Sequence, residues 1–225
     1  MPKVKMPRST PSLDMTPMVD LAFLLVTFFM LTSSFRSPEP VFVDPPASTT
    51  EKEIPKQVFL VTIDETGRVF IDITNAAVKE KVLRDMMVDY KVGLSEEEIK
   101  KFIGSGPLGM RVAELPSFLA QEAEKRAKIA EAAAGVPYDT ANKIRTCELY
   151  NWVLKSRLVA DNDFKMREAA AQEKNQGFDK DNYMQFVVKA AKDTRYETVK
   201  NVIDVLREAR VSKFQMITGL EAKPE

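Results

Sequence analysis

The sequence contains no histidine and one cysteine, Cys147. The absence of histidine excludes Ser-His-Asp and Cys-His catalytic arrangements, imidazole proton shuttles and most zinc sites. A single cysteine excludes an internal disulfide bond and multi-cysteine metal sites. Lone carboxylates in strand-like segments, such as Asp64 and Asp72, are weak evidence for catalysis. We therefore predict a protein that is not an enzyme and that has no metal site and no resident cofactor.

The chain also lacks an excess of charge of either sign. Its 33 Lys and Arg residues balance 33 Asp and Glu residues, so the formal net charge is zero. A protein without net positive charge has no general attraction for a polyanion. Nucleic acid is therefore not an expected partner.

One long segment is almost free of charge. Between Leu13 and Phe35 the only ionisable residues are Asp14 and Asp20. A helix over residues 16–35 would be about 30 Å long at 1.5 Å per residue, which is about the thickness of the hydrocarbon core of a bilayer. The sequence therefore predicts a transmembrane helix, to which we assign residues 13–35.

A cleaved signal peptide is the alternative interpretation of this segment. Asp20 at the start of the apolar run argues against it, and the following sequence "SSFRSPEP" lacks the small residues of a cleavage site. Basic residues in the preceding tail, residues 1–12, outnumber the single Arg36 just after the run. The positive-inside rule then places the N-terminus in the cytoplasm and the remainder of the chain across the membrane.

Asp20 is the unusual residue of the predicted span. A carboxylate at the centre of a membrane helix costs about 2.5 to 3.5 kcal/mol on insertion scales, and less near the interface. At about 100° per residue it shares one helix face with three hydroxyl side chains; they are Thr16, Thr27 and Ser34. In one interpretation Asp20 is a tolerated interfacial acid and the hydroxyls bond to their own helix. In the other, this polar stripe faces partner helices or a wet cavity, and Asp20 binds a proton or an ion.

Residues 36–56 are predicted to form an extended linker. Five prolines lie between residues 36 and 55, and proline-rich segments are semi-rigid and extended. Within the linker the sequence "VFVD" has high β-propensity, and an isolated short strand favours pairing with another chain. The candidate residues for such a partner strand are Val41, Phe42, Val43 and Asp44.

The rest of the chain predicts an α+β fold. Residues 58–63 and 68–74 are strand-like and flank "DETG", where Gly67 suits a turn with positive φ. The later order of elements is helix, insertion, strand, helix and strand, as given by the sequences "NAAVKEKVLRDMMVDYK", "NYMQFVVKAA", "RYETVKNVIDVLREAR" and "SKFQMIT". We predict a β-β-α-insertion-β-α-β domain formed by residues 57–94 and 178–225.

Helical periodicity identifies the residues that the helices of this domain bury. Val78, Val82 and Met86 share the apolar face of the first helix, and either Val88 or Tyr90 extends that face. The apolar face of the last helix contains Val199, Val202, Ile203 and Leu206.

The insertion, residues 95–177, is predicted to be mainly helical. Ser95 and Glu98 have the spacing of a capping box at a helix start. A single helix is expected from Pro116 to Gly135, and one or two more after it. Trp152 is expected to pack between these helices, together with Leu149 and Val153.

Several of these features together resemble the ExbD/TolR family of biopolymer transport proteins. They are the basic tail, the sequence "TPMVDLAFLLVTFFML", the proline-bearing linker and the sequence "RYETVKNVIDVLREARVSKFQMIT". The resemblance covers roughly residues 8–90 and 180–220, whereas the insertion departs from the family pattern. By motif, Asp20 corresponds to the essential membrane aspartate of the family.

The resemblance implies a function and a location. Family members lie as two copies within a ring of multi-span ExbB or TolQ subunits and use the proton-motive force to drive a TonB- or TolA-like partner in outer-membrane transport. The implied location is the inner membrane of a Gram-negative bacterium, with the C-terminal domain in the periplasm and protons as the coupling ion. A lone carboxylate favours protons, although sodium stays open.

Two alternatives to a TonB-coupled motor subunit stay open from the sequence. The first is a TolR-like subunit for envelope integrity, because the sequence decides poorly between the two kinds of partner. The second is a passive, membrane-anchored periplasmic binding module, in which Asp20 would have no role.

Overall fold

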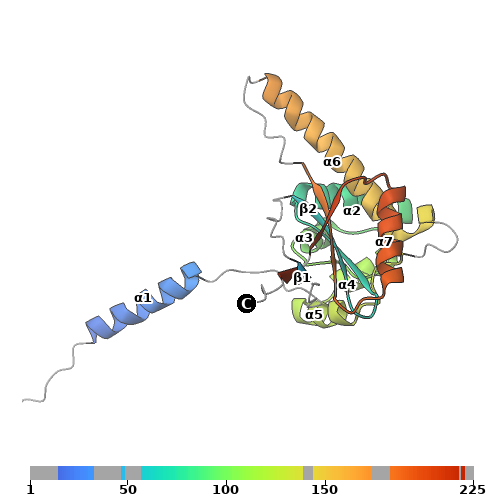
Figure 1. Cartoon of the computed structure of the whole chain (residues 1–225). Coiled ribbons are helices and arrows are strands. Elements are labelled where there is room, and N and C mark those ends of the chain that lie inside the picture. The colour runs from blue at the N-terminus through green and yellow to red at the C-terminus, as the bar shows by residue number, and fades with distance from the viewer. Residues whose placement is uncertain are drawn as a thin grey trace, which may run out of the picture. The chain divides into compact units, whose positions relative to one another are not determined.

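The computed structural model describes residues 15–32, 47–48, 57–138, 144–173, 183–217 and 219–220. The chain divides into two compact units, residues 1–37 and residues 38–225. The first unit contains helix α1 (Thr16–Thr32), and the second contains the other described helices and strands (Figure 1).

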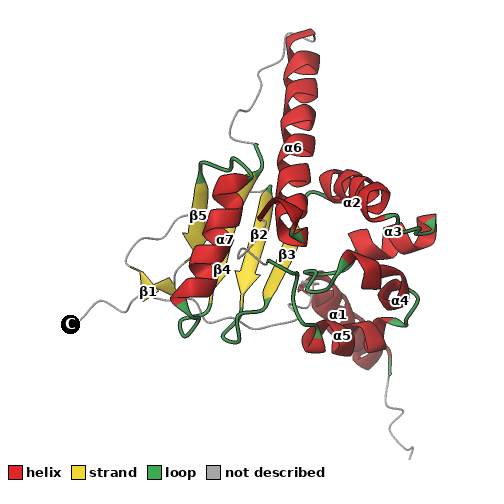
Figure 2. Ribbon diagram, turned by 90° about the vertical axis from the view of Figure 1, so that its right-hand side faces the viewer, coloured by secondary structure: helices red, strands yellow, loops and turns green. Residues whose placement is uncertain are grey.

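A four-stranded sheet forms the centre of the second unit (Figure 2). Its order is β3-β2-β4-β5, with β2 antiparallel to β3 and parallel to β4, and with β4 parallel to β5. The strands are β2 (Val58–Ile63), β3 (Val69–Ile73), β4 (Gln185–Ala190) and β5 (Phe214–Ile217). A separate short parallel pair joins β1 (Ala47–Ser48) to β6 (Gly219–Leu220). The predicted α+β class is confirmed.

The predicted hairpin joins β2 to β3. Gly67 has a φ of 86°, a conformation that favours glycine, and its N–H donates to the Asp64 carbonyl at 3.1 Å. The turn sets the register in which Ile63 pairs with Val69. The glycine in the turn and the apolar residues of the flanking strands therefore both favour the β2–β3 hairpin.

Helices α2 (Ala76–Tyr90) and α7 (Tyr196–Glu208) follow β3 and β4. The side chain of Asn75 caps α2 by accepting from the N–H groups of Ala77 and Val78. The expected inward residues Val78, Val82 and Met86 of α2 are all buried, as are Val202 and Leu206 of α7. The prediction that Val88 extends the apolar face of α2 is wrong, because this residue is 76% exposed. The alternative residue, Tyr90, is half-buried, and its hydroxyl accepts a hydrogen bond from the Asn151 side chain.

Between α2 and β4 the chain is mostly helical. The elements are α3 (Glu96–Ile103), the 3-10 turn η1 (Val112–Glu114), α4 (Leu115–Leu119), α5 (Ala123–Ala132), the 3-10 turn η2 (Ile144–Thr146) and α6 (Glu148–Glu173). The predicted capping box is present at the start of α3, where Ser95 and Glu98 each accept from the other's backbone N–H.

The prediction of a single helix from Pro116 to Gly135 is wrong, because the structure has two helices there, α4 and α5. Glu122 has the extended backbone of an N-cap, with φ −67° and ψ 156°. The two helices also differ in burial: Phe118 and Leu119 of α4 enter the core, whereas α5 has no buried residue. A change of direction at residues 120–122 therefore lets α4 pack inward while α5 stays at the surface.

The helices after residue 95 share a core with the sheet rather than forming a separate layer. Trp152, Leu149 and Val153 of α6 are fully buried, as expected, and the Trp152 ring stacks on Phe102 with centroids 6.3 Å apart. One apolar cluster contains these side chains together with those of α2 and β2. Leu108 also pairs with Ile71 at the edge of β3, with N–O distances of 2.7 and 2.9 Å. This segment therefore covers one edge of the sheet.

Candidate functional site

Helix α1 is the apolar segment noted in the sequence. It contains 17 residues, Thr16–Thr32, and is about 25 Å long at 1.5 Å per residue. Residues 13–14 and 33–35 of the predicted span lie outside the described residues. Among the described helices none combines the length and the apolar character needed to cross a membrane. Every side chain from Thr16 to Leu31 is exposed, including large ones such as Phe28 and Phe29.

Asp20 is the one ionisable residue of α1, and its side chain is exposed. At about 100° per residue, Thr16, Asp20 and Thr27 lie within about 40° of one another around the helix axis. The Thr27 hydroxyl donates to the Leu24 carbonyl at 2.9 Å, which is the bond to its own helix that one interpretation expected. Its oxygen still has lone pairs that can accept a hydrogen bond. The helix therefore presents a carboxylate and a hydroxyl oxygen on one face.

The other candidate residues lie outside the described residues. They are Ser34 of the polar stripe and the partner-strand segment Val41–Asp44. The nearest described part of the linker is β1, which pairs with β6 of the same chain.

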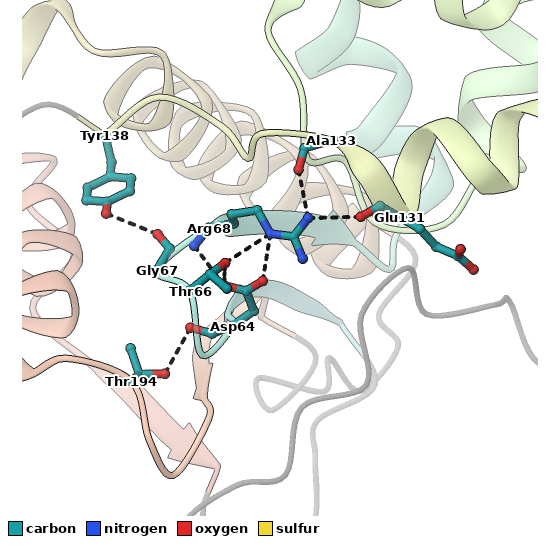
Figure 3. Close-up of polar contacts among 8 residues, drawn as sticks. All are labelled: Asp64, Thr66, Gly67, Arg68, Glu131, Ala133, Tyr138 and Thr194. Atoms are coloured by element: carbon teal, nitrogen blue, oxygen red, sulfur yellow. Dashed lines mark hydrogen bonds and ion pairs between the residues drawn. The ribbon is translucent and has the colours of Figure 1, made fainter.

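A second polar cluster surrounds the β2–β3 turn (Figure 3). The Asp64 residue is 3% exposed. Its carboxylate accepts hydrogen bonds from the Thr66 hydroxyl at 2.7 Å, the Arg68 N–H at 2.9 Å and the Arg68 Nε at 2.7 Å. The turn therefore closes around a buried charge that has three donors.

This turn cluster also holds distant segments. Arg68 Nη1 donates to the carbonyls of Glu131 at 2.9 Å and Ala133 at 3.1 Å, and the Thr194 hydroxyl donates to the Asp64 carbonyl at 3.1 Å. The Tyr138 hydroxyl donates to the Gly67 carbonyl at 3.0 Å. Figure 3 shows these groups converging on the turn from three parts of the chain. The cluster therefore links the β2–β3 turn to distant segments by hydrogen bonds. The sequence analysis did not predict these links, although the spacing of Asp and Arg in "DETGR" was a local signal for the turn.

Burial alone would raise the pKa of the Asp64 carboxyl, but hydrogen bonds from Thr66 and Arg68 and the Arg68 charge together hold this pKa below its usual value. Because the folded-state pKa is lowered, the stabilisation is fully present above the unfolded-state pKa of about 3.9. It is lost as the pH falls through the lowered folded-state value.

Asp64→Asn should lower the free energy of unfolding at pH 7 by about 1 to 3 kcal/mol, because it removes the buried charge that accepts hydrogen bonds from Arg68 and Thr66. The difference from wild type should shrink on acidification below about pH 4. Thermal unfolding of both proteins at pH 7 and pH 3 measures this. Glu65→Gln, at the exposed neighbouring residue, is the control and should change little at either pH. An equal loss for Asp64→Asn at both pH values would contradict a role for its charge.

No group of three or more His, Cys, Asp or Glu side chains that could hold a metal ion occurs within the described ranges of the chain. The chemistry available to α1 is therefore that of one carboxylate and its neighbouring hydroxyl oxygens. These groups can bind or release a proton and can accept hydrogen bonds.

Comparison with known proteins assigns the first part of the chain. Residues 6–100 match the family model described as Biopolymer transport protein ExbD/TolR. No curated protein and no solved structure matches the chain. The matched range includes Asp20, the linker, the β2–β3 hairpin and α2, and it ends within α3. The resemblance drawn from the sequence is thus confirmed for residues 6–100, which are similar to the ExbD/TolR family, whereas residues 180–220, which the resemblance also included, lie outside the matched range.

Proposed function

We propose that the chain is a proton-driven subunit of an energy-transducing complex in the inner membrane of a Gram-negative bacterium. Residues 13–35 form its single transmembrane helix, the N-terminus lies in the cytoplasm, and the folded unit lies in the periplasm. One observation carries the proposal: α1 has a lone carboxylate among exposed apolar side chains. The match of this range to the ExbD/TolR family supports it.

The exposure of α1 supports the membrane location. A helix that is apolar around its circumference is stable when lipid or other helices cover it. The compact unit that contains α1 provides no such cover of its own, because the side chains from Thr16 to Leu31 are exposed. The sequence continues without charge from Ser33 to Phe35, so the run from Thr16 has about the 20 residues that a bilayer-spanning helix requires.

Asp20 is the group through which the proton passes. A carboxyl group crosses apolar surroundings at lower cost when it is protonated, because a charged group loses its hydration there. The Asp20 carboxyl takes a proton from the periplasmic side and becomes neutral. The helix then turns or tilts within the partner ring, and Asp20 releases the proton towards the cytoplasm. Each proton that moves through 100 mV provides about 2.3 kcal/mol, enough to favour one of two states of the helix.

The partners that we propose follow the family. A second copy of the chain and a ring of ExbB- or TolQ-like subunits surround α1, and the periplasmic unit passes motion to a TonB- or TolA-like protein. A TonB-like partner leads to outer-membrane transport and a TolA-like partner to envelope integrity. An anchored binding module without ion coupling is the rival, and activity of an Asp20→Asn variant distinguishes the two.

The full chain should copurify from native membranes with a multi-span protein, since a single helix with a carboxylate needs other helices to cover Asp20. Affinity purification in a mild detergent followed by mass spectrometry measures this. A variant that lacks residues 1–37, the first compact unit, is the control and should elute without that partner. Recovery of the full chain as a monomer without any partner would contradict the proposed assembly.

A further inference from the structure

A hollow of about 510 Å³ opens beside the first residues of β4 and β5. Helix α6 contributes Arg157 and Asp161 to its wall, and the segment between α7 and β5 contributes Arg210 and Lys213. Tyr183, just before β4, completes the polar part of the wall. All the residues that line the hollow lie after the family match, which ends at residue 100.

The positive charges of this hollow are not neutralised by ion pairs within the described part of the chain. Arg157, Arg210 and Lys213 each lack a carboxylate partner there, whereas other cations of the same unit, such as Lys155, have one. The single acidic residue of the wall is Asp161, whose carboxylate accepts a hydrogen bond from the Tyr183 hydroxyl at 2.5 Å. The wall of the hollow therefore carries three positive charges and one negative charge.

Arg157 has an unsatisfied donor. Its Nε atom is withdrawn from solvent and has no hydrogen-bond acceptor within the described residues. Native proteins seldom keep a buried donor without an acceptor, and Arg126 and Arg167 have Nε atoms in the same state elsewhere in the described residues. An acceptor bound in the hollow would supply the missing partner.

Arg210 occupies a backbone position that usually favours glycine. It follows the end of α7 with a φ of 60°, and the next N–H, of Val211, donates to the Leu206 carbonyl at 2.9 Å. This is the left-handed termination of a helix, where a residue with a side chain is strained relative to glycine. The sequence places an arginine there, and its side chain lines the hollow.

The Tyr183 hydroxyl donates a hydrogen bond to the Asp161 carboxylate in the wall of the hollow. Burial, together with the hydrogen bond and the charge of Asp161, raises the pKa of Tyr183 to about 12. The hydroxyl therefore stays protonated at neutral pH and remains a donor to the Asp161 carboxylate.

We propose that this hollow is a binding site for an anionic organic ligand, which it holds through phosphate or carboxylate oxygens by means of Arg157, Arg210 and Lys213. Guanidinium groups form paired hydrogen bonds with both kinds of oxyanion. The volume falls within the range of about 300 to 1,000 Å³ that is typical of small-molecule sites, and it exceeds what a bare ion needs. The site is independent of the proton pathway on α1.

Titration of the purified full chain in detergent with inorganic phosphate, glycerol 3-phosphate and succinate tests this site by isothermal calorimetry. At least one of the three should bind saturably, and Arg157→Gln and Lys213→Gln should each weaken that binding about tenfold or more, because each removes a charge-assisted hydrogen bond to the anion. Tighter binding of glycerol 3-phosphate than of phosphate would identify an organic phosphate, and preference for succinate would identify a carboxylate.

Two controls keep this test decisive. Lys200→Gln removes an equally positive, exposed side chain of α7 that does not line the hollow, and it should leave binding unchanged. Lys213 is exposed, so its substitution should not affect folding even if Arg157→Gln does. Absence of binding by all three anions at millimolar concentration would overturn the proposal. It would also be overturned if Lys200→Gln weakened binding as much as Lys213→Gln.

Discussion

Cells that carry Asp20→Asn should lose the energy-dependent activity of the complex down to the level of cells without the protein. Asparagine keeps the shape of the side chain and part of its hydrogen bonding, but it cannot take up and release a proton. Insertion into the membrane and copurification with the multi-span partner should persist, because the apolar side chains of α1 are unchanged. The measurement is energy-dependent uptake, or envelope integrity, at matched membrane levels of each variant.

Two further substitutions sharpen this test. Asp20→Glu should keep at most part of the activity, because the longer side chain moves the carboxyl by about one methylene group from its partners. Asp14→Asn should cost little, because Asp14 precedes the apolar run and asparagine has a similar shape and can accept hydrogen bonds as aspartate does. Wild-type activity of Asp20→Asn would remove the proton-driven function and favour the anchored binding module.

Local sequence signals predicted the elements of the sheet well. The limits of β2 and its turn at Gly67 follow from alternating apolar residues and from a residue that tolerates positive φ. The capping box at Ser95 is equally local. These features need only neighbouring residues, so one sequence contains the information for them.

Features that depend on distant segments were not predictable in the same way. The turn cluster around Asp64 depends on carbonyls near residue 132 and on Thr194, which the fold brings to the turn. The break between α4 and α5 arises because only α4 has a place in the core. The cationic hollow combines Arg157 with residues more than fifty positions later, and none of these side chains is unusual in its own segment. The prediction for Asp20 rests on a local signal, a charge in an apolar run.

Deletion of residues 95–177 tests whether their helices are an addition to the family domain or part of its core. The sequence analysis treated them as an insertion, but Leu149, Trp152 and Val153 belong to one buried cluster with the apolar face of α2. The deletion would expose that face and uncover the edge of β3 that Leu108 occupies. We therefore expect the second compact unit, residues 38–225, to lose cooperative unfolding, as measured by circular dichroism during heating.

Single substitutions in α6 separate core packing from the presence of the helix. Trp152→Ala, at a fully buried side chain, should lower the free energy of unfolding by about 3 to 5 kcal/mol. Leu158→Ala, at a residue of the same helix that is 46% exposed, is the matched control and should cost much less. Copurification with the multi-span partner should survive the deletion, because α1 belongs to a separate unit. A deletion variant with wild-type unfolding would show that strands β2 to β5, α2 and α7 form a complete domain without the inserted helices.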